Sequence, residues 1–70
     1  MTIIINKQKL FDKISDEDLL HREFIMRSKL DYLSIRRLYS RDTEFAEIPK
    51  TVFTRILRIL KTTKKTLSKD

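Results

Sequence analysis

The sequence predicts a compact all-α domain of four to five short helices. Apolar residues recur three and four positions apart through residues 49–61, which is the spacing of one buried helix face. Residues that favour helix N-caps stand before several shorter stretches with similar spacing. The connections between these stretches are brief. Seventy residues form one domain, 1–70, whose small core gives it modest stability.

The sequence of residues 2–27 predicts a strand-like start followed by two helices. Residues 2–6 are β-branched and apolar, and because a lone strand is unstable in water, we expect either an arm that pairs across a dimer or a disordered start. Asn6 can cap a helix over residues 7–14. Ser15 begins a capping-box variant, which predicts a second helix over residues 16–27 whose acidic first turn suits the helix dipole.

The middle of the chain predicts a third helix and a loop. Asp31 is placed to cap a helix over residues 32–40, in which Ile35 and Leu38 are expected to be buried. Residues 41–48 are rich in acids and predict a loop, with Phe45 as its apolar anchor. These boundaries leave residues 28–30 as the turn before the third helix.

The last third predicts a long amphipathic helix and a short one. Pro49 suits the first turn of a helix over residues 49–61, where its missing N–H is no loss. Arg55 and Arg58 are expected to point outward from this helix. A final helix over residues 64–69 follows a threonine cap. The expected core face of the long helix consists of Phe53, Ile56, Leu57 and Leu60.

Charge is unevenly distributed along this basic chain. The formal charge is +6 and the pI is near 9.9, values that are typical of polyanion binders but also occur in small basic domains with no such partner. Residues 27–41 hold five cations and one acid, and residues 55–69 hold six cations and no acid. Residues 12–23 reverse the balance, with five acids and two cations.

Composition also argues against several classes of protein. With no cysteine and one histidine, the chain lacks the ligands of a zinc site, and we expect no metal or other cofactor. The absence of glycine argues against phosphate-cradling loops. We expect no membrane segment and no secretory signal, and therefore a cytoplasmic protein. No constellation of side chains suggests a preorganised catalytic site, so we expect the protein not to be an enzyme.

The second half of the chain resembles the Cro/repressor-type (Xre-like) helix-turn-helix regulators of phages, plasmids and bacteria. In that family a Gly-apolar-Ser turn precedes a recognition helix whose fourth residue is Ile or Val. Here Lys29-Leu30-Asp31 occupies the turn, Ile35 is the fourth residue of the helix over 32–40, and Leu38 takes the second buried position. The later residues that resemble the family are Pro49, Phe53, Ile56, Leu57, Leu60 and Leu67.

The first half of the chain matches the family in either of two ways. Residues 14–20 resemble the start of the family's second helix, which leaves residues 25–29 as extra length before the third helix. Alternatively, Phe24 and Ile25 stand at the family's Leu-Ala pair, so that the second helix starts early. Neither alignment recovers the family's glutamine or its small alanine.

The resemblance implies a helix-turn-helix domain that binds DNA as a homodimer, with the helix over 32–40 in the major groove. The residues that we expect to contact DNA are Arg27, Lys29, Tyr32, Leu33, Ser34, Arg36, Arg37 and Arg41. The alternative interpretation of this helix is an ordinary solvated charged face. A second function stays open as well: a small phage-type antagonist or antitoxin-like protein that binds another regulator, such as a repressor, and blocks its DNA binding.

Overall fold

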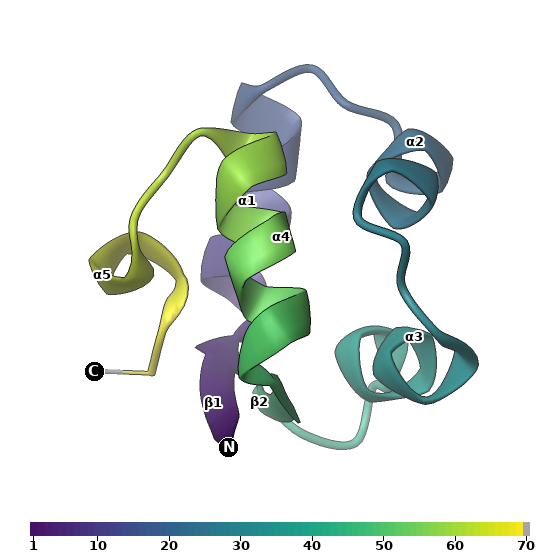
Figure 1. The fold of residues 1–70 in the computed structure, drawn as a ribbon, viewed down its shortest axis with the longest axis vertical. Coiled ribbons are helices and arrows are strands. Elements are labelled where there is room, and N and C mark those ends of the chain that lie inside the picture. The colour runs from purple at the N-terminus through teal and green to yellow at the C-terminus, as the bar shows by residue number, and fades with distance from the viewer. Residues whose placement is uncertain (70) are drawn as a thin grey trace.

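Five helices and two strands make up the part of the chain described by the computed structural model, residues 1–69 (Figure 1). In chain order they are β1 Thr2–Asn6, α1 Lys7–Asp16, α2 His21–Arg27, α3 Tyr32–Tyr39, β2 Phe45–Pro49, α4 Lys50–Leu60 and α5 Lys64–Leu67. The expectation of an all-α domain is therefore wrong, because a two-stranded antiparallel sheet joins the helices.

The sheet pairs the start of the chain with the segment that follows α3. Thr2 lies opposite Pro49 and Asn6 lies opposite Phe45, so the two strands are matched along their whole length. Residues 2–6 are thus neither an arm that reaches across a dimer nor a disordered start. These residues form a strand within the chain, because β2 supplies the backbone hydrogen bonds that a lone strand lacks.

The second strand replaces the second half of the loop expected over residues 41–48. Ala46 and Ile48 are buried while the residue between them is exposed, which is the alternation of a half-buried strand. Pro49 ends this strand, and the fourth helix begins one residue later, at Lys50. Pro49 therefore occupies the N-cap position and not the first helical turn.

The first helix begins as the sequence predicts. The side chain of Asn6 accepts a hydrogen bond from the backbone N–H of Lys9 at 3.1 Å, which confirms Asn6 as the N-cap. Leu10 and Ile14 turn one face of α1 into the core and are almost fully buried. The helix expected over residues 7–14 is therefore confirmed.

The second helix starts later than the expected boundary of residues 16–27. Ser15 does not act as an N-cap but lies inside α1, which continues to Asp16. The chain then reverses at Asp18, whose φ of 55° lies in the left-handed region that aspartate tolerates better than most residues. Leu20 is the N-cap of α2 and is 61% exposed.

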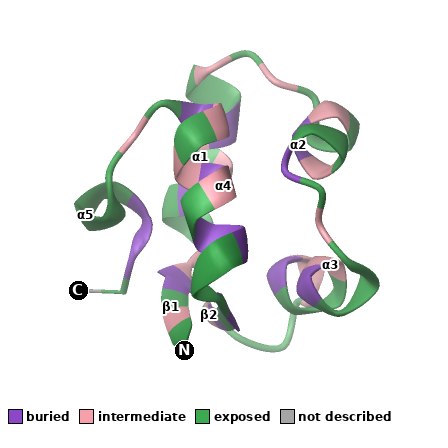
Figure 2. Ribbon diagram, viewed as in Figure 1, coloured by how far each residue is buried: buried purple, intermediate pink, exposed green. Residues whose placement is uncertain are grey.

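One core collects side chains from every helix and both strands (Figure 2). Its fully buried apolar members include Ile5, Leu10, Phe24, Leu38, Ile48, Ile56, Leu60 and Leu67. Phe53 is also buried, whereas Leu57 is only partly buried and packs at the margin. The C-terminal segment joins the sheet, because Ser68 forms an antiparallel bridge with Ile5 on the edge of β1 away from β2.

The ammonium group of Lys7 holds the end of α3 against the start of α1. Lys7 is only 5% exposed, and its Nζ donates to the carbonyl oxygens of Ser40 at 2.8 Å and Thr43 at 3.0 Å. It also donates to the Thr43 hydroxyl at 3.2 Å. These acceptors are neutral, so Lys7 fixes the connection between α3 and β2 through charge-assisted hydrogen bonds and not through an ion pair.

We expect Lys7→Met to destabilise the domain by about 2 kcal/mol, because hydrogen bonds from a charged group contribute more to stability than neutral ones. Urea denaturation followed by circular dichroism measures the loss. Lys9→Met, on an exposed position of the same helix, is the matched control and should change stability little. Equal midpoints for the two variants would contradict the role of Lys7.

Candidate nucleic-acid interface

The turn between α2 and α3 is closed by a pair of reverse hydrogen bonds. The N–H of Lys29 donates to the carbonyl of Met26 at 3.2 Å, and the N–H of Leu30 donates to the carbonyl of Ile25 at 3.3 Å. This is the Schellman pattern, which requires a left-handed residue after the helix. Lys29 takes that conformation with φ 52°, at the position where the resembled family has glycine.

Arg55 of α4 reaches across to this turn. Its Nε donates to the carbonyl of Ser28 at 2.9 Å, and its Nη2 donates to the carbonyl of Lys29 at 3.4 Å. The expectation that Arg55 points outward is therefore wrong. Carbonyls at the C-terminal end of a helix lack intrahelical donors and attract cations, which explains why a guanidinium settles here. Arg58 does remain exposed.

The start of α3 is tied by a contact between Asp31 and Ser34. The Ser34 hydroxyl donates to Oδ1 of Asp31 at 2.6 Å, and Ser34 is only 2% exposed. Ser34, one of the residues expected to contact DNA, is thus buried and does not share the outward face of α3. The Ser34 hydrogen bond, aided by nearby backbone N–H groups, holds the pKa of Asp31 below its ordinary value of 3.8, although burial opposes this shift.

Four of the expected contact residues share the outward face of α3. Tyr32 is 74% exposed and Leu33 is 50% exposed, while Arg36 and Arg37 are exposed as well. The guanidinium carbon of Arg36 lies 5.8 Å from the centroid of the Tyr32 ring, a cation–π arrangement that holds Arg36 over the ring.

The inner face of α3 differs from the expected one. Leu38 is fully buried, as predicted, but Ile35 is only partly buried. Ser34 takes the second inward position in its place, one helical turn before Leu38. The helix is therefore rotated slightly about its axis relative to the expectation, which moves Ser34 inward and leaves both arginines outside.

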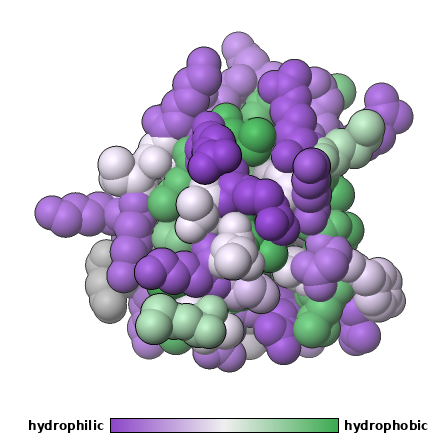
Figure 3. Space-filling model, in the orientation of Figure 1, coloured by the Kyte–Doolittle hydropathy of each residue, from purple (hydrophilic) through white to green (hydrophobic). Residues whose placement is uncertain are grey.

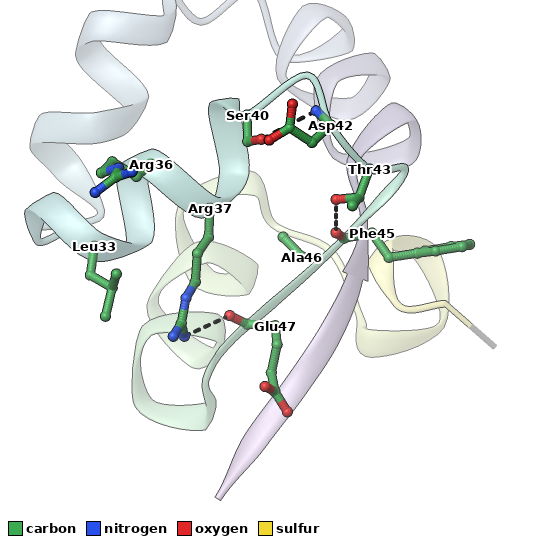
Figure 4. A pocket seen from close by; sticks show the side chains of 9 residues that line it. All are labelled: Leu33, Arg36, Arg37, Ser40, Asp42, Thr43, Phe45, Ala46 and Glu47. Carbon is green, nitrogen blue, oxygen red and sulfur yellow. Dashed lines mark hydrogen bonds between the residues drawn. The ribbon is translucent and has the colours of Figure 1, made fainter.

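Arg37 bridges a groove between α3 and β2 (Figure 4). Its Nη1 donates to the backbone carbonyl of Glu47 at 3.1 Å. The groove has a volume of about 480 Å³, with Leu33 on its helix side and Phe45 on its strand side. Because the partner of Arg37 is a carbonyl and not a carboxylate, its positive charge is not neutralised.

The three flanking cations differ in their availability. Arg27 forms an exposed ion pair with Glu23, with Nη2 and Oε2 3.4 Å apart. Lys29 and Arg41 are exposed, and neither takes part in an ion pair within residues 1–69. Lys29 and Arg41 are therefore the better candidates for contacts with phosphates.

Three aromatic rings that the sequence did not single out as a group hold α3 to α1 and α2. The rings of Phe11, His21 and Tyr39 lie with centroids 5.4 to 5.5 Å apart. The Tyr39 oxygen is 2.7 Å from Nδ1 of His21, and burial raises the pKa of Tyr39 to about 12. Tyr39 thus stays protonated at neutral pH. This cluster packs the end of α3 against α1 and α2.

Comparisons found no protein-family model, curated protein or solved structure that matches the chain. None of the helices within residues 1–69 combines the length and apolar character needed to cross a bilayer. In the same part of the chain, no three histidine or acidic side chains gather where they could share a metal ion.

We expect Lys29→Gly to stabilise the domain by about 0.5–1 kcal/mol, because glycine adopts the left-handed conformation without the clash that a Cβ brings. Thermal unfolding of the wild type and the variant measures the gain. Lys9→Gly, within the regular turns of α1, is the control and should instead lower stability. A loss of stability in Lys29→Gly would show that the side chain of Lys29 has a structural role.

The Asp31 contact predicts a pH-dependent difference between the wild type and Asp31→Asn. Because the folded-state pKa lies below 3.8, the ionised Asp31 adds stability above its unfolded-state pKa, and this contribution disappears as the pH falls through the folded-state value. The wild type should therefore be more stable at neutral pH, and the difference should shrink in acid below 3.8. Urea midpoints at a series of pH values test this; a constant difference would contradict it.

Proposed function

We propose that the protein is a sequence-specific DNA-binding transcriptional regulator of phage or plasmid type. The observation that carries the proposal is the outward face of α3, where Arg36 and Arg37 stay exposed and unpaired with any carboxylate in residues 1–69. The opposite face of the same helix is locked into the core by Leu38. A helix whose inner face is packed into the core and whose outer face carries unpaired cations is suited to bind in the major groove of DNA.

The dimensions and side chains of α3 fit a major groove. An α-helix with its side chains is about 10–12 Å in diameter, and the major groove of B-DNA, which is about 12 Å wide, admits one. Arg36, which lies over the Tyr32 ring, is suited to a bidentate contact with guanine. Leu33 offers an apolar surface for a thymine methyl group. Lys29 and Arg41 would contact flanking phosphates.

The two arginines of this face have different parts in the proposal. Arg36 is the base reader, because no backbone acceptor restrains it. Arg37 is a positioning residue, since its hydrogen bond to the Glu47 carbonyl connects α3 to β2. Its charge also attracts phosphates whatever the base sequence.

A homodimer in the cytoplasm completes the proposal, and the sheet limits how it forms. The first strand is paired within its own chain, and the outer edge of β2 is partly covered. On that edge the carbonyl of Glu47 accepts from Arg37, and the carbonyl of Phe45 accepts from the Thr43 hydroxyl at 2.7 Å. Covered edges resist further strand pairing, so the dimer contact would lie elsewhere on the molecule.

A second function is favoured by a different observation: the helix-turn-helix unit exposes several large apolar side chains. Leu20, Met26, Tyr32 and Leu33 are each at least half exposed. Such side chains on one unit are typical of a surface that binds protein, so an antagonist of another regulator is the alternative proposal. A one-to-one complex with a repressor and no binding of DNA at low salt would favour it.

We expect Arg36→Ala to lose about 1–3 kcal/mol of affinity for the preferred sequence and to relax the base preference, because one bidentate contact is removed. Arg37→Ala should weaken binding to all sequences alike. The measurement is selection from a random duplex library followed by anisotropy titration of the selected and scrambled duplexes. Lys9→Ala, on α1, is the control. Absence of binding to any duplex at low salt would overturn the proposal.

A further inference from the structure

We propose that the outward sides of α4 and α5 form a second nucleic-acid surface, which binds backbone phosphates independently of α3. This cationic α4–α5 surface consists of Lys50, Arg58, Lys61, Lys64 and Lys65, and each of these residues is exposed. The inference goes beyond the proposed function, because it concerns a face of the molecule that takes no part in reading bases.

Two cations of α4, Lys50 and Arg58, and Lys61 directly after it form a stripe along one outward side of the helix, whereas Arg55 lies on another side. Lys50, Thr54, Arg58 and Lys61 follow one another at intervals of four, four and three residues, which is the spacing of one helix face. The opposite side of the helix is buried in the core through residues such as Ile56. The stripe extends for about 16 Å, long enough to span several phosphates of one strand.

No carboxylate offsets the charge of this surface within the described chain. Residues 48–69 contain seven cations and no acid. The ion pairs in residues 1–69 are Lys13 with Glu17 and Arg27 with Glu23, both on other helices. The cations of the α4–α5 surface therefore add to one positive field, which concentrates anions and counterions next to it.

The other side chains of this surface favour nucleic acid over a lipid bilayer. On α4 and α5 the exposed residues are cations and threonines, including Thr51 and Thr66, and no exposed residue is apolar. A helix that lies on a membrane needs apolar side chains to bury among the acyl chains, and this surface has none to offer. Hydroxyl and cationic side chains are the groups that contact DNA phosphates.

The α4–α5 surface and the outward face of α3 are distinct. Arg55 marks the side of α4 that faces the α2–α3 turn, and the cationic stripe lies roughly 100° further round the helix. In Figure 1, α4 lies at the front, with α2 and α3 to one side and α5 to the other. Figure 3 shows that hydrophilic side chains predominate on the face occupied by α4. Phosphates bound to the α4–α5 surface would belong to DNA that flanks the segment bound by α3, or to a second segment of nucleic acid.

The test is the salt dependence of binding to a random-sequence duplex. We expect Arg58→Gln/Lys61→Gln to reduce the slope of log K against log salt by about 1.8, because each phosphate contact contributes about 0.9. The affinity of the Arg58→Gln/Lys61→Gln variant should fall by the same factor for every duplex sequence. Lys9→Gln/Arg22→Gln removes the same charge from exposed positions of α1 and α2 that take no part in either ion pair, and it is the matched control. Circular dichroism checks that both variants fold.

A slope equal to that of the wild type in Arg58→Gln/Lys61→Gln would overturn the inference, as would an equal reduction in the control. Loss of binding to polyglutamate without loss of binding to the duplex would also overturn it, since the partner would then be an acidic protein. Arg36→Ala separates the two proposals. If that variant keeps the full base preference while the slope falls in Arg58→Gln/Lys61→Gln, the α3 proposal fails and the α4–α5 surface stands.

Discussion

The pairing of β1 with β2 is the constraint on which the position of α3 depends. The strands come from opposite ends of residues 2–49, so three helices and their turns form a loop whose two ends are joined by backbone hydrogen bonds. Lys7 begins α1 directly after β1 and reaches the end of α3 just before β2. The helix that we propose to read DNA is thus attached at its end to the only sheet within residues 1–69. Its orientation follows from that closure.

Several cations of this basic chain maintain the fold, and they do so without losing charge. Lys7, Arg37 and Arg55 all donate to backbone carbonyls. A carbonyl satisfies the donor but leaves the formal charge, whereas a carboxylate would cancel it. The same side chains can therefore stabilise the fold and still contribute positive charge that attracts polyanions. A fold that used ion pairs at these three places would have a weaker positive field around α3.

Sequence patterns a few residues long correctly predicted those features of the fold that depend on interactions between neighbouring residues. The cap at Asn6, the start of α3 at Tyr32 and the core face of α4 depend on neighbours within a few residues. The strand over 45–49 was missed because its partner is remote, its alternation is short, and Pro49 also suits a helix start. The outward arginines were predicted, but the inward turn of Ser34 was not, since a small rotation of α3 depends on tertiary packing.

Lys29 occupies a left-handed position that glycine would adopt more easily. Glycine would meet the left-handed requirement of the turn at no steric cost, while lysine accepts about 1 kcal/mol of strain. The reverse hydrogen bonds and the contact from Arg55 hold the turn in place despite that strain. In return, an exposed ammonium lies at the entrance to α3, where glycine would place none. Such an ammonium would suit the phosphate contact that we propose for Lys29.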